Sequence, residues 1–177
     1  GEIGDILAKA KTDMENALHS MKVSFRLIGD FLHEEQGDEH KDYVTWIQTK
    51  TYSLSAGATV KDLLEKALDE TGLQETGADD GYVSAILAPE ALGGYWLGEM
   101  DNGANSGWMY TVNGEHPDQA LNDFTLEAGD KVIWHYVDDY TTEADAETWL
   151  KAADISPEEY AKQKLARIVQ VIGGGTV

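Results

Sequence analysis

The stretch GWMYTVNGEHP, residues 107–117, alternates between the two faces of an extended chain and then reaches an Asn-Gly pair. Period-two alternation of this kind is typical of a β-strand, which would place Trp108 and Tyr110 on the same face. Asn113-Gly114 predicts a tight turn, because such turns need residues that tolerate positive φ. Two interpretations of the aromatic face stay open: it is core, or it is a surface that contacts a ligand.

Further strands are predicted on both sides of this stretch. Segments rich in Val, Ile, Thr and aromatic residues, bounded by Gly, Pro or Asp, have the composition of strands. The two most N-terminal of them make a hairpin with a long charged connection. The predicted strands are VSFRLIGDFL at 23–32, YVTWIQTKTYSL at 43–54, YVSAILA at 82–88, a short aromatic piece GYWLGE at 94–99, and KVIWHYV at 131–137.

Helical periodicity appears in the middle of the chain and near both ends. Thr59 is placed to cap a helix over 60–71, and Gly72 is placed to end it. Apolar residues at helical spacing predict another helix over 5–21. After the last strand, Thr142 is expected to cap a short helix containing Trp149 and Leu150, and Ser156-Pro157 to start a helix that runs to about Ile172.

The order strand-strand-helix-strand-strand-strand predicts an α+β fold, specifically a β-grasp arrangement in which a mixed sheet wraps around one helix. The chain then divides into an N-terminal helix over 1–22, a β-grasp domain over 23–140 and a C-terminal helical extension over 141–177. The terminal helices either cover the open face of the sheet or pair with each other as a small bundle, and pairing is the favoured alternative.

Charge and composition limit the classes of partner. The chain of 177 residues carries a formal net charge of −20, and residues 72–140 contain 13 Asp and Glu and one Lys. Such a field repels nucleic acid and anionic membrane surfaces. The absence of Cys excludes thiol catalysis and disulfides. The sequence contains no run of 18 apolar residues, so membrane insertion is not predicted. Because Gly1 is not an initiator Met, we expect a piece of a longer protein whose targeting segment lies elsewhere.

Five segments in a fixed order resemble a known family. They are the strand pair, then GATVKDLLEKAL, GYVSAI, SGWMYTVNG and finally LEAGDKVIWHY. The sequence is similar to the β-grasp family of bacterial surface proteins that also includes the C-terminal β domain of transcobalamin and intrinsic factor. The similarity covers about 120 of the 177 residues, and its most specific part is the last two motifs in that order and spacing.

The resemblance implies an extracellular or cell-surface binding module without catalytic activity. In the vitamin carriers this domain packs over cobalamin against a large helical barrel. Only about 20 residues precede the first predicted strand here, so no such barrel is present in this sequence. Corrinoid binding is therefore the alternative function, and a general binding or adhesion role is the first hypothesis.

Aromatic residues beside Asp and Asn form the predicted ligand surface. Aromatic rings with neighbouring polar side chains suit a glycan, a corrinoid or a protein partner. We place this surface on the loops at 93–108, with the Asn113-Gly114 turn at its edge. The predicted ligand-binding residues are Tyr95, Trp96, Asp101, Asn102, Asn105, Trp108, Tyr110 and Asn113.

Metal and catalytic sites are less favoured by the sequence than the aromatic ligand surface. His33 and His40 flank an acidic loop but do not form an HExxH pair, and zinc would need further ligands. Calcium is possible at 99–105, at Asp79-Asp80 or after the last strand at Asp138-Asp139, although ordinary turns explain these residues equally. No enzyme motif is present, so the chain is predicted to be non-catalytic, with no required cofactor and no metal. A glycan-active enzyme is the least favoured alternative.

Overall fold

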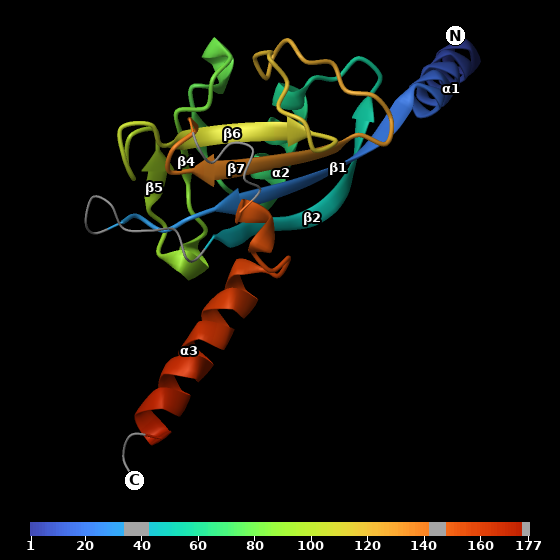
Figure 1. Ribbon diagram of the computed structural model, residues 1–177. Coiled ribbons are helices and arrows are strands. Elements are labelled where there is room, and N and C mark those ends of the chain that lie inside the picture. The colour runs from blue at the N-terminus through green and yellow to red at the C-terminus, as the bar shows by residue number, and fades with distance from the viewer. Residues whose placement is uncertain (34–42, 142–147, 175–177) are drawn as a thin grey trace.

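A computed structural model describes residues 1–33, 43–141 and 148–174. Within these residues the chain forms a mixed α+β structure with two sheets and three α-helices, which confirms the expected class (Figure 1). The strands are β1 (Ser20–Gly29), β2 (Val44–Ser55), β3 (Glu75–Thr76), β4 (Ala85–Leu87), β5 (Trp96–Gly98), β6 (Gly107–Val112) and β7 (Lys131–Val137). The α-helices are α1 (Glu2–Leu18), α2 (Val60–Thr71) and α3 (Pro157–Gly174).

The larger sheet has four strands in the order β2-β1-β7-β6. β1 pairs antiparallel with β2 and parallel with β7, while β7 pairs antiparallel with β6. The parallel pair aligns Ile28 with His135, so β1 and β7 end at the same edge of the sheet. β6 is the outer strand, and its second edge has no neighbouring strand in this sheet.

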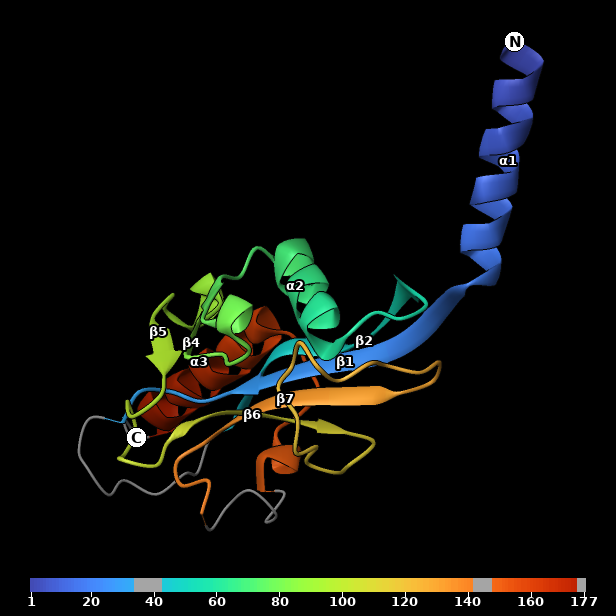
Figure 2. The same cartoon turned by 90° about the horizontal axis from the view of Figure 1, so that it is seen from above.

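Helix α2 begins and ends where the local sequence predicts. The Thr59 side chain accepts a hydrogen bond from the Asp62 backbone N–H at 3.3 Å, and the Asp62 carboxylate accepts one from the Thr59 N–H at 2.9 Å. Gly72 ends the helix with φ 73°, a conformation that favours glycine. The apolar face of α2, including Leu63 and Leu64, is buried against one face of the four-stranded sheet (Figure 2).

A second sheet of three short strands, in the order β3-β4-β5, differs from the single sheet that the sequence predicted. The strand expected at 82–88 is confined to β4, and the two-residue β3 was not predicted. The turns around Gly77 and Gly81, both with positive φ, connect β3 to β4 within this sheet. The second sheet lies on the same side of the larger sheet as α2 (Figure 2).

The opposite face of the larger sheet is partly covered by the 3₁₀ helix η3 (Thr148–Lys151). Trp149 of this helix is buried against Ile28 and Val137. The helix expected to begin at Thr142 lies partly outside the described residues, because 142–147 are not among them.

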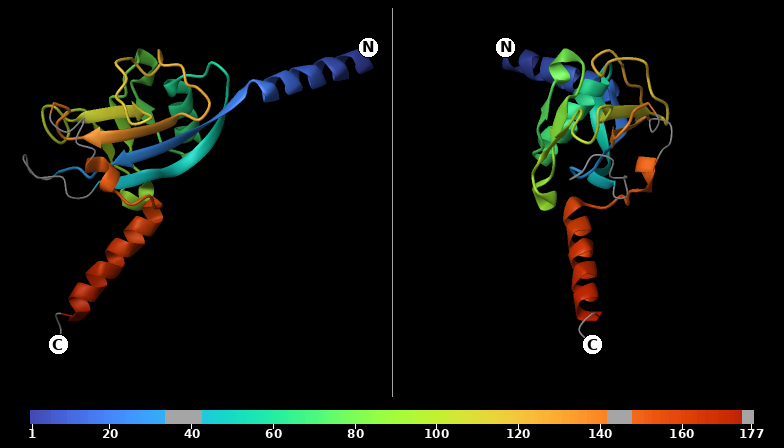
Figure 3. Two further views of the ribbon diagram at one scale, coloured as in Figure 1. Left: turned by 45° about the vertical axis from the view of Figure 1, so that its right-hand side comes forward. Right: turned by 60° about the vertical axis from the view of Figure 1, so that its left-hand side comes forward.

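The terminal helices neither pair with each other nor cover the sheet, contrary to the favoured expectation. α1 projects from one end of the larger sheet and α3 from another part of the domain, and the two point in different directions (Figures 1 and 3). The reason is positional: α1 runs directly into the start of β1, whereas α3 begins near β2 and the 3₁₀ helix η2 (Glu90–Leu92). No helix among the described residues is long and apolar enough to cross a bilayer.

Candidate functional site

A pocket of about 440 Å³ lies beside β6. Its walls are formed by β6, by the segment at 81–83 and by the connection at 116–121, with Trp134 of β7 contributing from the neighbouring strand. The size falls within the range of small-molecule sites in proteins. The aromatic and apolar residues that line it are Tyr82, Val83, Trp108, Met109, Tyr110, Pro117, Leu121, Trp134 and Tyr140.

Two tyrosines mark the exposed part of the pocket. Tyr82 is 48% exposed and Tyr140 is 50% exposed, although both are large aromatic side chains. Burial and the neighbouring Glu99 carboxylate raise the pKa of Tyr82 to about 12. The phenol is therefore neutral at physiological pH, and the pocket mouth offers uncharged aromatic surface.

The inner part of the pocket is more rigid. Tyr110 packs against Trp134 with ring centroids 5.0 Å apart, and its hydroxyl donates to the Gln119 carbonyl oxygen at 2.6 Å. Burial raises the pKa of Tyr110 to about 12, so this phenol is also neutral at physiological pH. Trp108 is 4% exposed, and its indole N–H donates to the Leu97 carbonyl at 2.8 Å. These contacts fix the aromatic wall in one arrangement before any ligand arrives.

The free edge of β6 supplies backbone polar groups. In an antiparallel ladder, alternate residues direct their N–H and C=O groups to opposite sides of the strand. The Asn113 N–H bonds to the Lys131 carbonyl at the start of β7, whereas the Val112 N–H bonds to Glu115 on the other side. Trp108 and Tyr110 share the parity of Val112, so their N–H and C=O groups point away from β7.

Trp134 adds an unsatisfied donor. Its side chain lines the pocket and is 2% exposed, and no polar atom of the described residues accepts a hydrogen bond from its indole N–H. A buried donor without an acceptor is unfavourable by about 1–3 kcal/mol. The indole N–H is itself buried, so a ligand in the pocket would contact the ring and not this donor.

The sequence-predicted site residues divide between this pocket and the structure around it. Trp108 and Tyr110 line the pocket, but Trp108 lies in the core and does not present an exposed surface. Asn113 has φ 54° in the tight turn, and its side chain bonds to Asp130 and to the Lys131 backbone N–H. The Asn-Gly turn is confirmed, and the polar groups of Asn113 hold the ends of β6 and β7 together.

Tyr95 and Trp96 lie away from the pocket lining. The Tyr95 hydroxyl donates to the Asp30 carbonyl oxygen at 2.6 Å, and Trp96 is 41% exposed on β5. Asn105 accepts a hydrogen bond at its carbonyl from the Tyr140 N–H at 3.0 Å. The predicted surface at 93–108 is thus largely a set of structural contacts, and the apolar pocket lies beside it.

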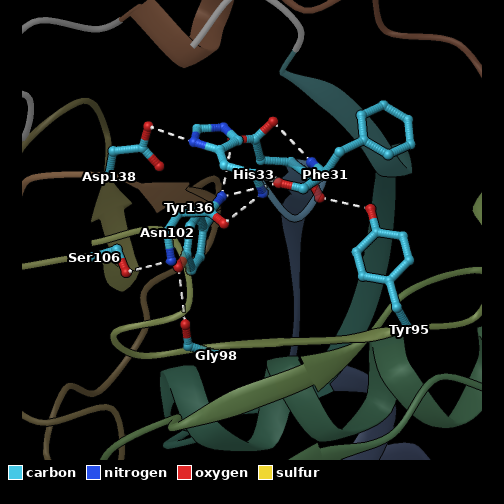
Figure 4. A network of polar contacts seen from close by, with 9 residues as sticks. Phe31, His33, Tyr95, Gly98, Asn102, Ser106, Tyr136 and Asp138 are labelled. Carbon is cyan, nitrogen blue, oxygen red and sulfur yellow. Dashed lines mark hydrogen bonds and ion pairs between the residues drawn. The ribbon is translucent and has the colours of Figure 1, made fainter. Parts of the chain in front are cut away.

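Asn102 belongs to a polar network at the edge where β1 and β7 end (Figure 4), and Asp101 directly precedes it in the sequence. The Asp101 carboxylate accepts from the Gly98 N–H at 2.7 Å. Asn102 accepts from the His33 N–H at 3.0 Å and donates to the Phe31 carbonyl at 2.9 Å. Asn102 therefore ties the loop after β5 to the segment that follows β1.

Two of the carboxylates considered for calcium make internal contacts. Asp79 forms an ion pair with Lys61 at 2.9 Å, and Asp101 accepts from the Gly98 N–H. His40, the second histidine of the zinc hypothesis, lies outside the described residues. Among the residues that the structure does describe, the side chains of Asp30, His33 and Asp138 place their potential ligand atoms within 4.8 Å of one another.

Sequence reasoning missed most of the pocket lining: the aromatic residues Tyr82, His116, Trp134 and Tyr140 were not among the predicted ligand-binding residues. Tyr82 and Tyr140 both follow acidic, turn-rich segments, and a large aromatic in such a segment is an available signal. Their convergence on β6 depends on contacts between distant segments, such as the approach of the Tyr82 hydroxyl to Gly107.

Comparison with known proteins gives partial similarities. Residues 57–138, slightly under half of the chain, match the family described as a domain of unknown function, DUF4430. A crystal structure of haptocorrin in complex with Cbi shares 12% identity, with 68% of this chain and 25% of that chain covered and a TM-score of 0.37. At that score the likeness supports no conclusion about this chain. No curated protein matches it.

Proposed function

We propose that this chain is a non-catalytic binding module whose pocket beside β6 holds an uncharged saccharide unit. The observation that carries the proposal is a 440 Å³ pocket with an aromatic wall beside the free backbone edge of β6. A sugar presents a flat apolar face together with hydroxyl groups, and it therefore matches both features of the pocket.

The aromatic surface provides the nonpolar part of recognition. Tyr82 and Tyr140 line the pocket and are each about half exposed, so a pyranose ring can stack on them. The edge groups of Trp108 and Tyr110 supply backbone donors and acceptors in fixed positions. Sugar hydroxyls and acetamido groups both donate and accept, so they suit this mixed set.

Charge selects against acidic ligands. The chain has a net charge of −20, and anions are repelled by such a field. The ligand is accordingly a neutral sugar, for which an N-acetylated hexosamine is the most suitable probe. Anionic glycans are expected to bind more weakly than their neutral counterparts.

The architecture supports a binding role in a β-grasp domain. α2 follows the β1–β2 hairpin and packs on a sheet in which β1 is parallel to β7, the arrangement expected of that fold. The pocket lining among the described residues contains no Asp or Glu, whereas glycoside hydrolysis requires two carboxylates. With the sequence resemblance to bacterial surface proteins, these features support a secreted or cell-surface module.

A calorimetric titration with N,N′-diacetylchitobiose tests the proposal. Trp134→Phe reduces the aromatic wall of the pocket and is expected to weaken binding roughly tenfold. Trp46→Phe is the matched control, because the Trp46 indole N–H is also buried without an acceptor in the described residues but does not line the pocket. Equal weakening by both substitutions, or no binding by the wild type, would contradict the proposal.

A corrinoid is the alternative ligand, and the sequence motifs at 107–114 and 126–136 favour it. A corrin ring is larger than this pocket and would insert only an edge with its amide side chains. Titration with dicyanocobinamide under the same conditions separates the two ligands. If cobinamide binds in a manner that depends on Trp134 and chitobiose does not bind, the corrinoid becomes the proposed ligand in place of the saccharide.

A further inference from the structure

A second cluster of polar side chains lies at the edge where β1 and β7 end. Asp30 directly follows β1, His33 lies three residues further along, and Asp138 directly follows β7. Because β1 and β7 are parallel neighbours, their C-terminal ends meet, and residues 108 positions apart in the sequence become neighbours. The pairing of the strands therefore determines the position of the cluster.

The histidine ring lies between the two carboxylates. His33 Nε2 is 3.1 Å from Asp30 Oδ2, and His33 Nδ1 is 3.5 Å from Asp138 Oδ2. The side chains are 13%, 3% and 14% exposed for His33, Asp30 and Asp138, respectively. Figure 4 shows His33 facing Asp138 across the end of the sheet.

Surrounding residues fix the backbone that carries these side chains. Asn102 accepts from the His33 N–H and donates to the Phe31 carbonyl, and its amide also lies 3.4 Å from Asp30 Oδ2. The Tyr95 hydroxyl donates to the Asp30 carbonyl oxygen, and the Phe31 N–H donates to Asp30 Oδ1 at 2.8 Å. Fixed supporting contacts of this kind are typical of preorganised ligand sites.

We propose that Asp30, His33 and Asp138 form a binding site for a divalent metal ion of the zinc type. Two carboxylates and one imidazole whose potential ligand atoms lie within 4.8 Å of one another offer donor types that zinc binds in proteins. One imidazole nitrogen and one oxygen from each Asp supply three ligands, and water completes the coordination.

The ligand chemistry favours zinc over calcium. Calcium takes six to eight oxygen ligands, whereas imidazole with carboxylates suits zinc and related transition metals. Zinc bonds to nitrogen and oxygen are about 2.0–2.2 Å long, so ligand atoms within 4.8 Å of one another need only small side-chain rotations to reach one ion. The ion would link the ends of β1 and β7, independently of the pocket beside β6.

Calorimetric titration of the chelator-treated protein with ZnCl₂ tests this site. One ion per chain is expected to bind, and Asp30→Asn, His33→Gln and Asp138→Asn are each expected to weaken binding at least about tenfold. Asp139→Asn is the matched control, because the Asp139 carboxylate accepts from the Thr141 N–H and is not one of the three ligands. Zinc should raise the melting temperature of the wild type and of this control.

Absorption of the Co²⁺-loaded wild type provides a second measurement that needs no variant. Visible bands of a low-symmetry site with a nitrogen ligand are expected, and His33→Gln should change them. The proposal is overturned if the wild type binds no zinc, if zinc binding is unchanged in all three substituted proteins, or if Ca²⁺ binds more tightly than Zn²⁺. Circular dichroism of each variant establishes that a loss of binding is not a loss of folding.

Discussion

The imidazole of His135 lies flat on the indole of Trp149, with ring centroids 3.8 Å apart and planes inclined by 11°. This stack joins the middle of β7 to the 3₁₀ helix η3 on the face opposite α2. His135 is fully buried, and no atom of the described residues forms a hydrogen bond with either ring nitrogen. The ring is therefore held by packing, and His116 approaches it with a centroid distance of 5.5 Å.

The stability of the protein is expected to decrease as the pH falls below about 6.5. Burial, with a contribution from His116, lowers the pKa of His135 well below its ordinary value, so the folded state keeps this ring neutral. The unfolded chain takes up the proton near the ordinary pKa, and below that pH the unfolded state binds more protons. The loss is up to about 1.4 kcal/mol per pH unit, and it is absent at higher pH.

Urea unfolding at pH 7.5 and pH 5.5 measures this effect, with His135→Phe as the comparison. Phenylalanine keeps an aromatic ring on Trp149 but cannot take up a proton. The substituted protein should lose less stability between the two pH values than the wild type. An equal loss in both proteins would assign the pH dependence to other groups.

Substitution of either exposed pocket tyrosine is expected to weaken saccharide binding without destabilising the fold. Tyr82→Ala and Tyr140→Ala each remove about 1 kcal/mol of stacking, or roughly a fivefold loss of affinity for diacetylchitobiose. Trp96→Ala is the control, because Trp96 is exposed to a similar extent but lies outside the pocket lining. If Trp96→Ala has the larger effect, the ligand surface lies on the loops at 93–108 instead.

Gly29→Ala is expected to destabilise the protein by about 1–3 kcal/mol. A Cβ at Gly29 would lie 2.1 Å from a ring carbon of the buried Trp46, which has little room to move. Gly4→Ala in α1 meets no atom within 4 Å and is expected to be neutral or slightly stabilising, because alanine favours helix. Comparable unfolding midpoints for the two variants would show that the Trp46 side chain moves to accommodate the added Cβ without loss of stability.

Asn113→Ala is expected to lower the free energy of unfolding by about 1–3 kcal/mol. The substitution places alanine at φ 54° and removes the side-chain bonds to Asp130 and Lys131. Asn113→Gly keeps the turn conformation and loses only the side-chain bonds, so it should be the milder change. Equal destabilisation by the two substitutions would assign no role to the backbone conformation.

Local signals in the sequence were sufficient for most of the larger sheet and for α2. The capping box at Thr59 and Asp62 and the glycine at the helix end specify α2 through contacts within a few residues. The alternation at 107–112 and 131–137 likewise matches β6 and β7. Strands were predicted where β4 and β5 lie, but the two-residue β3 has too few side chains to show a period, and the separate sheet that it forms with them was missed.

The candidate sites depend on contacts that no local pattern reveals. Tyr82 and Tyr140 reach the pocket only because the segments at 81–83 and 116–121 lie beside the edge of β6. Asp30 and Asp138 meet because β1 pairs parallel with β7. Likewise, no local pattern showed that the Asn102 amide, predicted to bind a ligand, holds the segment after β1.

The most direct test of the proposed function is a ¹H–¹⁵N correlation spectrum of the three indole N–H groups of Trp46, Trp134 and Trp149 during a titration with diacetylchitobiose. All three are buried and without an acceptor in the described residues, but only Trp134 lines the pocket. We expect the Trp134 signal to move in a saturable manner while the other two move much less. A titration in which the Trp134 signal stays still, or moves no more than those of Trp46 and Trp149, would contradict saccharide binding in this pocket.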